Sequence, residues 1–329
     1  MLLWIIKNQL FKVLVGQAEA QSFMPAQGSE IAKSVDSLYS FLLIVSLIAC
    51  VIVIGGMIYF AVKYKRKSDN DKTAYISHDT RLEILWSVIP LVIFLFVFAW
   101  GWVIYHDMRT MPKDALEIQV MGQQWNWTAE YKNGVKSGEI VIPVNRDVKL
   151  ILSSSDVIHS LYIPTFRIKQ DAVPGRYTAL SLKAEGTGEF HIFCTEFCGT
   201  SHSGMMTKLR VLSQADFDKW LAEEGDSASL PLAERGKKLF NIKCTACHYA
   251  NEDKPKIGPS LQHLFAQENH QVESGVIKVV DENYIRESIL YPQAQIAKGY
   301  GPRSAMTAFQ GQLSEKEVTS LIEFIKTLK

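Results

Sequence analysis

The stretch Cys194-Thr-Glu-Phe-Cys198-Gly-Thr-Ser-His202-Ser-Gly-Met205 carries the most chemical information in this 329-residue chain. A mononuclear copper loop of the blue type uses one thiolate, one imidazole and a weak thioether, which Cys198, His202 and Met205 supply. Cys194 is then a surplus thiolate one short turn away, so that both sulfurs can bridge two metals. Each metal needs its own imidazole, and the best second candidate is His159. The loop therefore predicts a closed dinuclear copper site that transfers electrons and leaves no position for a substrate.

Two other interpretations explain fewer of these residues. Two cysteines and two histidines can bind zinc, but zinc has no use for Met205, and structural zinc cysteines usually stand closer together in the sequence. A redox disulfide would leave His202 and Met205 without a role. His191 lies in an alternating strand pattern, so we interpret it as an ordinary sheet residue.

The residues around the loop have the pattern of a β-sheet domain. Short alternating or β-branched runs follow one another between residues 116 and 212: LEIQV, EIVIPV, VKLIL, YTALSL, EFHIF and TKLRVL. Several short strands at this spacing predict an antiparallel β-sandwich of about a hundred residues. We expect this cupredoxin-like domain over residues 111–222, followed by a polar linker over residues 223–230.

Two long apolar runs precede the predicted sandwich. They are LYSFLLIVSLIACVIVIGGMIYFAV (38–62) and ILWSVIPLVIFLFVFAWGWVI (84–104). Each reaches the roughly 20 residues that a helix needs to cross a bilayer, so residues 34–110 are expected to form a two-helix transmembrane anchor. The loop between the runs is rich in basic residues, which places it in the cytoplasm and both termini on the outer face. These basic residues are Lys63, Lys65, Arg66, Lys67, Lys72 and Arg81.

Residues 1–33 form a separate N-terminal segment. Its apolar stretch is interrupted by Lys7 and Lys12, whereas a signal peptide carries its positive charge before the apolar core. Removal of this segment as a signal peptide therefore stays open. Cys50 ends a sequence that resembles a lipidation box, but apolar sequence continues past it, and we interpret it as a packing residue.

A second chemical motif, Cys244-Thr-Ala-Cys247-His248, follows the linker. It is the c-type haem attachment pattern, in which two cysteines form thioethers and the histidine binds the iron. Helical patterns surround it: AERGKKLFNI, ENYIRESIL and LSEKEVTSLIEFIKTL. In the last of these, Ser314 and Glu317 form a capping-box pattern. With this motif and these helices, residues 231–329 resemble a small class I cytochrome c, which implies an all-α domain.

The sixth ligand of the haem iron is expected on a loop before the last helix. Met306 occupies such a loop, and no other methionine follows Met206. A thioether ligand raises the reduction potential, which suits electron transfer. His263 and His270 are the alternatives, and their positions soon after the attachment motif match less well. The net charge of +1 gives no reason to expect a nucleic-acid partner.

The helix pair, the Cys-x-Glu-x-Cys-Gly-x-x-His-x-x-Met loop and the preceding Asp-x-x-His together resemble subunit II of cytochrome c oxidase from Ser34 to Leu212. With the haem domain included, the layout resembles the bacterial caa3-type subunit II that carries a fused cytochrome c. The resemblance implies that Glu196 ligates the dinuclear copper centre, called CuA, through its backbone carbonyl. It also implies that the Glu196 carboxylate reaches a magnesium ion shared with subunit I. The side-chain ligands that it implies are His159, Cys194, Cys198, His202 and Met205.

Three further residues resemble family positions. Glu83 is similar to a glutamate near the mouth of a proton channel, although a carboxylate that stabilises a helix start explains it equally well. Trp125 lies in a stretch similar to the one where an external cytochrome c delivers electrons. Gln123 and Asn126 replace the usual histidine and tyrosine there, which weakens the expectation of an identical docking surface. The carbonyl of Pro259 is expected to accept a hydrogen bond from the haem-ligating imidazole.

The resemblance implies an electron-entry subunit that itself catalyses nothing. Electrons would pass from haem c to CuA and on to subunit I, where oxygen is reduced to water with proton translocation. The expected partners are subunit I, other oxidase subunits, and an upstream cytochrome or quinol-oxidising complex. The expected location is the bacterial cytoplasmic membrane, with the copper and haem domains on its outer face. A nitric oxide reductase subunit with the same copper centre and a free-standing membrane electron shuttle are the alternatives.

Overall fold

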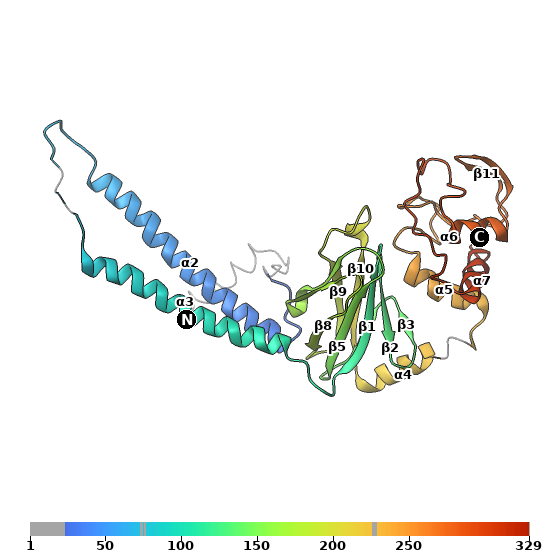
Figure 1. Cartoon of the computed structure of the whole chain (residues 1–329), viewed down its shortest axis with the longest axis horizontal. Coiled ribbons are helices and arrows are strands. Elements are labelled where there is room, and N and C mark those ends of the chain that lie inside the picture. The colour runs from blue at the N-terminus through green and yellow to red at the C-terminus, as the bar shows by residue number, and fades with distance from the viewer. Residues whose placement is uncertain (1–23, 73–74, 76, 226–228, 329) are drawn as a thin grey trace, which may run out of the picture.

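The structure is a computed structural model that describes residues 24–72, 75, 77–225 and 229–328. The predicted N-terminal segment lies outside the described residues up to residue 23. A long helix pair extends from one end of a β-sandwich, and a smaller, mainly helical domain lies on the opposite side (Figure 1). This arrangement confirms the predicted fold class of anchor, sandwich and cytochrome domain.

The anchor consists of α2 (Glu30–Lys63) and α3 (Thr80–Arg109). Ser29 caps the first helix by accepting from Ala32 N, and the Asp79 carboxylate caps the second. Phe41 packs against Phe96 and Trp100 between the helices. The apolar stretch of each helix is exposed and long enough to cross a membrane. Side chains such as these are stable only in a lipid environment or against other proteins.

The sandwich contains two five-stranded sheets. The first has the order β3 (Lys136–Ser137), β2 (Asn126–Tyr131), β1 (Leu116–Gln123), β5 (Asp147–Ser154), β8 (Thr178–Lys183). The second has the order β4 (Ile140–Pro143), β10 (Met206–Leu212), β9 (Gly188–Cys194), β6 (His159–Ile163), β7 (Ile168–Ala172). The sheets are mixed and not wholly antiparallel as expected, because β1 pairs parallel with β5 and β4 with β10.

Large apolar side chains from both sheets fill the space between them. Trp127 and Phe166 are 2% and 1% exposed and are among the largest buried side chains. Helix α4 (Gln214–Gly225), which was not predicted, follows the last strand and packs Phe217 and Trp220 around the ring of Tyr131. Its last residues are the first residues of the predicted linker. The helix therefore covers one end of the sandwich before the chain enters the haem domain.

A buried ion pair joins the anchor to the sandwich. Arg167 follows the 3-10 helix η1 (Pro164–Phe166) and holds both carboxylate oxygens of Asp36, on α2, at 2.9 Å each. The same guanidinium also donates to the carbonyl of Pro25 at 2.6 Å. This two-pronged contact fixes the base of the helix pair against the sheet that carries the metal loop.

The C-terminal domain is built on α5 (Leu232–Lys243), α6 (Glu282–Leu290) and α7 (Glu315–Ile325). Helices α5 and α7 cross so closely that a Cβ at Gly236 would lie 1.8 Å from the carbonyl oxygen of Ser320. The rings of Phe240 and Phe324 pack at a tilt beside this crossing. The capping box of Ser314 and Glu317 is confirmed. The expectation of an all-α domain missed one feature, the hairpin of β11 (Glu268–Val272) and β12 (Gly275–Val279).

Candidate metal centre

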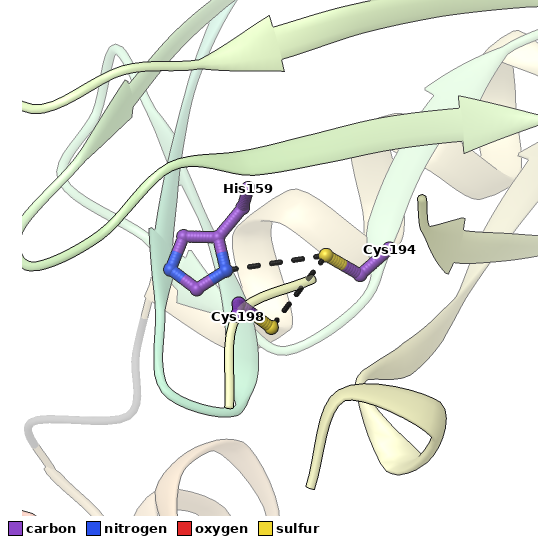
Figure 2. Close-up of side chains that lie close together, drawn as sticks. All are labelled: His159, Cys194 and Cys198. Atoms are coloured by element: carbon purple, nitrogen blue, oxygen red, sulfur yellow. Dashed lines mark hydrogen bonds between the residues drawn. The ribbon is translucent and has the colours of Figure 1, made fainter. Parts of the chain in front are cut away.

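Three neighbouring segments of the second sheet bring the predicted copper ligands together. His159 begins β6, Cys194 ends β9, and Cys198 follows in the loop that leads to β10. Figure 2 shows the imidazole of His159 and the sulfur atoms of both cysteines turned toward one another. The potential ligand atoms of these three residues all lie within 4.8 Å of each other. Antiparallel pairing of β6 with β9 places Leu161 opposite Cys194, so that the sheet register itself brings these strand ends close.

The two sulfur atoms form the middle of the site. Cys194 Sγ lies 3.8 Å from Cys198 Sγ, which is far longer than the disulfide bond length of about 2.05 Å. His159 Nδ1 lies 4.0 Å from Cys194 Sγ, and His202 Nδ1 lies 3.4 Å from Cys198 Sγ. A metal bound about 2.3 Å from one sulfur can therefore reach the other. Each sulfur has its own imidazole, as two bridged metals require.

Two weaker donors complete the set. Met205 Sδ lies 3.7 Å from Cys198 Sγ, and the backbone carbonyl of Glu196 lies 3.3 Å from Cys194 Sγ. Met205 is fully buried and His159 is as well, whereas the Glu196 side chain is exposed. Two thiols, two imidazoles, a thioether and a carbonyl suit copper better than a hard cation such as magnesium. The residues present therefore fit a dinuclear copper centre.

Asp156 orients His159. Its carboxylate lies 2.8 Å from His159 Nε2 and accepts from the backbone amides of Gln124 and Val157, both at 2.7 Å. With Nε2 occupied in this way, Nδ1 faces the sulfur atoms. Ligand imidazoles in metal sites commonly have such a carboxylate on the second nitrogen. The Asp-x-x-His spacing was noticed in the sequence, but the role of its first residue was not predicted.

The ionisation of the metal-free site also favours a cation. Burial opposes ionisation of Cys194, yet hydrogen bonds, first that of His159, bring its pKa down to about 6. Burial, and then the neighbouring Cys194 sulfur, raise the pKa of Cys198 to about 12. Burial disfavours the charged form of His159, but the hydrogen bond to Asp156 outweighs it and raises the imidazole pKa to about 9. Both cysteines can be thiolates at the same time only if a bound cation balances their charge. Metal ions would thus take the place of the protons on Cys198 and His159.

The turn between β1 and β2 lies against the metal loop. Trp125 Nε1 and Gln124 Nε2 both donate to the carbonyl of Cys198, at 3.1 and 2.7 Å. On β1, just before this turn, a Cβ at Gly122 would lie 2.9 Å from the His159 ring, so only glycine fits there. These contacts join residues far apart in the sequence, so no local sequence pattern predicts them. Of the residues involved, apart from the copper ligands, only Trp125 was assigned a role from the sequence.

Two other predicted residues lie away from this centre. Glu83 is in the first turn of α3, at the end of the helix pair opposite the sandwich (Figure 1). His191 is exposed on β9 and pairs across the sheet with Lys208, as an ordinary sheet residue does.

The haem attachment motif lies at the end of α5. The amides of Cys247 and His248 both donate to the carbonyl of Cys244, at 3.1 and 2.9 Å, which turns the motif back on itself. His248 Nδ1 donates to the carbonyl of Pro259 at 2.8 Å, which is the contact that the resemblance implied. Burial lowers the pKa of His248, so the imidazole is neutral and Nε2 is left for a metal. Burial raises the pKa of Cys244 to about 12, as expected for a thiol enclosed in an apolar cavity.

One apolar cavity contains both predicted axial ligands of the haem iron. His248 and Met306 line it together with Cys244 and Cys247, and apolar side chains from α5, α6 and α7 form its walls. Of the two alternative ligands, His270 lines the same cavity and His263 is not among its lining residues. The site thus fits a haem whose thioether, proximal and distal positions are all supplied by this domain.

Comparisons with known proteins agree over most of the chain. The family profile "Cytochrome C oxidase subunit II, transmembrane domain" matches residues 17–102, the periplasmic domain of the same family matches 135–211, and "Cytochrome c" matches 233–329. Cytochrome c oxidase subunit 2 of Alkalihalophilus pseudofirmus is 29% identical over 88% of this chain and 86% of that protein. A probable cytochrome c oxidase subunit 2 of Rickettsia bellii is 30% identical over 61% of this chain and 83% of that protein.

A solved structure is also similar. The periplasmic domain of subunit II of cytochrome oxidase from Bradyrhizobium japonicum is 32% identical, covers 35% of this chain and 96% of that one, and has a TM-score of 0.34. The family, however, is shown by the profiles and by the Rickettsia bellii relative, most of whose length this chain covers. The chain therefore belongs to the cytochrome c oxidase subunit II family and carries a cytochrome c domain at its C-terminus.

Proposed function

We propose that this chain is the electron-entry subunit of a bacterial haem-copper oxidase. It would relay electrons from its own haem c to CuA and on to subunit I, where oxygen is reduced to water with proton translocation. When bound, the copper pair and the haem iron supply sites that accept and release one electron at a time. The chain itself would catalyse no chemical conversion, because its copper ligand set leaves no open position.

One observation carries this proposal: each of two facing sulfurs has its own imidazole and its own weak donor. We assign His159, Cys194, the Glu196 carbonyl, Cys198, His202 and Met205 as the copper ligands. A set of ligands that is already in place changes little between redox states, which favours electron transfer over substrate binding. Asp156 holds the imidazole of His159 in place throughout.

The other site residues have roles on either side of this pocket. Trp125, which donates to the Cys198 carbonyl, would be the entry point for electrons. Cys244 and Cys247 would form the thioethers to haem c, with His248 and Met306 as axial ligands. The exposed carboxylate of Glu196 would reach a magnesium ion at the interface with subunit I.

The remaining parts of the proposal concern the membrane. We place α2 and α3 in the bacterial cytoplasmic membrane, with the copper and haem domains on its outer face. Glu83 would then lie at the cytoplasmic end of α3, where a proton channel of the partner subunit could open. An upstream cytochrome or a quinol-oxidising complex would deliver electrons to the haem domain.

Purification from membranes in mild detergent tests the proposal. A tag on the full chain should recover a polytopic subunit that contains haem, together with oxygen consumption that stops when Cys198 is replaced by Ser. The Asp147→Ser variant, which changes a partly exposed side chain on the other sheet, serves as the control. Recovery of the chain alone, with intact copper and haem signals, would favour a free-standing shuttle. A partner that reduces nitric oxide and not oxygen would favour the reductase.

A further inference from the structure

The contact between the haem domain and the copper domain is the most informative feature outside the metal sites. Cys247, one of the two haem-attaching cysteines, packs against the core cluster that contains Trp125, Cys194 and Cys198. The neighbouring cysteine, Cys244, packs instead against the core of its own domain. The haem attachment motif therefore lies between the two hydrophobic cores.

Polar contacts surround this packing, and they converge on one side chain of the copper domain. Gln123, at the end of β1, is only 4% exposed. Its amide nitrogen donates to the side-chain carbonyl of Gln312, and its amide oxygen lies 3.4 Å from Lys243 Nζ. Both ends of this buried amide thus find their partners in the haem domain. A buried amide is rarely left without partners, so this surface of the copper domain is suited to being covered.

Lys243 is the centre of the contact on the haem-domain side. It is the last residue of α5 and stands directly before Cys244. Besides Gln123, its ammonium group donates to Thr128 Oγ1, on β2, at 3.1 Å. Burial, and then repulsion by Lys136, lower the pKa of Lys243. Its charged form is therefore less favourable here than in water, and the contacts of the ammonium group must offset this cost. The ammonium group contacts two uncharged acceptors and no carboxylate. The contact therefore fixes the position of the haem domain by directed hydrogen bonds and not by pairing opposite charges.

Two further contacts define the edges of the interface. Thr307, next to the proposed axial ligand Met306, donates to the backbone carbonyl of Gln124 at 3.3 Å. On the other side, Lys238 of α5 forms an ion pair of 2.8 Å with Glu224 of α4. The haem domain is therefore held from both sides of its attachment motif.

We infer that Lys243, with Gln123, Thr128 and Gln312, forms a polar clasp that holds the haem domain over the β1–β2 turn, and that this covered turn is closed to external cytochromes. The inference rests on the proposed electron relay and adds a positioning residue to it. The replacement of the usual histidine at Gln123 then has a physical explanation, because the side chain binds the chain's own haem domain. An external donor would have to deliver its electron to the haem domain first.

Chemical labelling tests the clasp without measuring activity. The full chain in detergent is treated with a limiting acetylating reagent, and each lysine is followed by mass spectrometry. Lys243 should react about tenfold more slowly than Lys237, which is exposed on the same helix. The Gln123→Leu substitution should remove most of this protection. Equal reactivity of the two lysines in the unmodified chain would overturn the clasp.

Electron transfer tests the positioning role. After photochemical reduction of the haem in the full chain, Lys243→Met should slow copper reduction severalfold, because the loosened domain no longer holds the haem in one orientation near the copper site. Lys243→Arg should restore most of the rate. Lys326→Met is the matched control, because Lys326 bonds only within the haem domain, to Glu282 and Glu323. The copper potential should be unchanged in every variant, and the haem potential should be unchanged in Lys243→Arg and Lys326→Met, which separates positioning from the loss of charge in Lys243→Met.

The outcomes separate this inference from the proposed function. If the unmodified chain shows no transfer from haem to copper, the relay itself fails. If transfer occurs but Lys243→Met leaves its rate unchanged, the relay stands and the clasp is refuted. Mixing with a reduced soluble cytochrome c adds a check: haem absorbance should change before the copper band, and copper reduction that comes first would refute the closure.

Discussion

At the scale of single residues, the copper site depends on side chains that bind no metal. His159 can present Nδ1 to the sulfur atoms because Asp156 occupies Nε2. The same carboxylate accepts from the amide of Gln124, whose side chain in turn donates to the carbonyl of Cys198. A change at Asp156 is therefore transmitted to both sides of the metal loop.

Asp156→Asn should weaken copper binding about 10- to 100-fold, the usual cost of losing a partner behind a ligand imidazole. Asparagine has one acceptor oxygen in place of two, so it cannot accept from the Gln124 backbone and hold His159 at the same time. The orientation of His159 therefore becomes less fixed. Copper affinity is measured by competition with a chelator on the full chain. Asp147→Asn, at a carboxylate of the opposite sheet, should bind copper normally. An unchanged affinity in the Asp156 variant would refute the orienting role.

The haem iron allows a second comparison between residues. Met306 and His270 line the same cavity, and only one of them can be the sixth ligand. Met306→Ala should lower the haem potential on the order of 0.1 V or more, because a thioether ligand raises it. His270→Ala should leave the ligation spectrum of the oxidised haem unchanged. The reverse pattern would assign the ligand to His270.

At the scale of elements, alternation in the sequence predicted six strands of the sandwich at nearly their observed positions. Strand β6 was missed because it begins with two polar residues, His159 and Ser160, which are fully buried for reasons of long-range contact. Strand β7 was missed because its middle, Lys169-Gln170-Asp171, is polar. The parallel pairings were missed as well, since a strand pattern contains no information about its neighbour.

The joint between anchor and sandwich gives a prediction at this scale. Asp36→Ala leaves the Arg167 guanidinium, which is 5% exposed, without its carboxylate. We expect a loss of about 2 kcal/mol in the stability of the sandwich, less than for a fully buried pair because Asp36 is partly open to solvent. Thermal unfolding of the sandwich in detergent should shift downward by about 10 °C. Glu185→Gln, which removes an exposed ion pair with Lys33, should leave the unfolding temperature almost unchanged.

At the scale of the whole molecule, three units could be predicted because each has its own local signal. Uninterrupted apolar runs indicated the anchor, alternating runs the sandwich, and Cys-x-x-Cys-His the haem domain. The placement of the haem domain had no such signal. It depends on polar side chains that meet across more than a hundred residues: Gln123 donates to Gln312, and Thr128 accepts from Lys243.

The central claim is that two coppers share the sulfur atoms of Cys194 and Cys198. The most direct measurement is the metal content of the full chain together with the paramagnetic resonance spectrum of its oxidised copper. We expect two coppers and one haem per chain, and a copper signal with the electron shared between two nuclei. One copper with a single-nucleus signal, or zinc in its place, would contradict it.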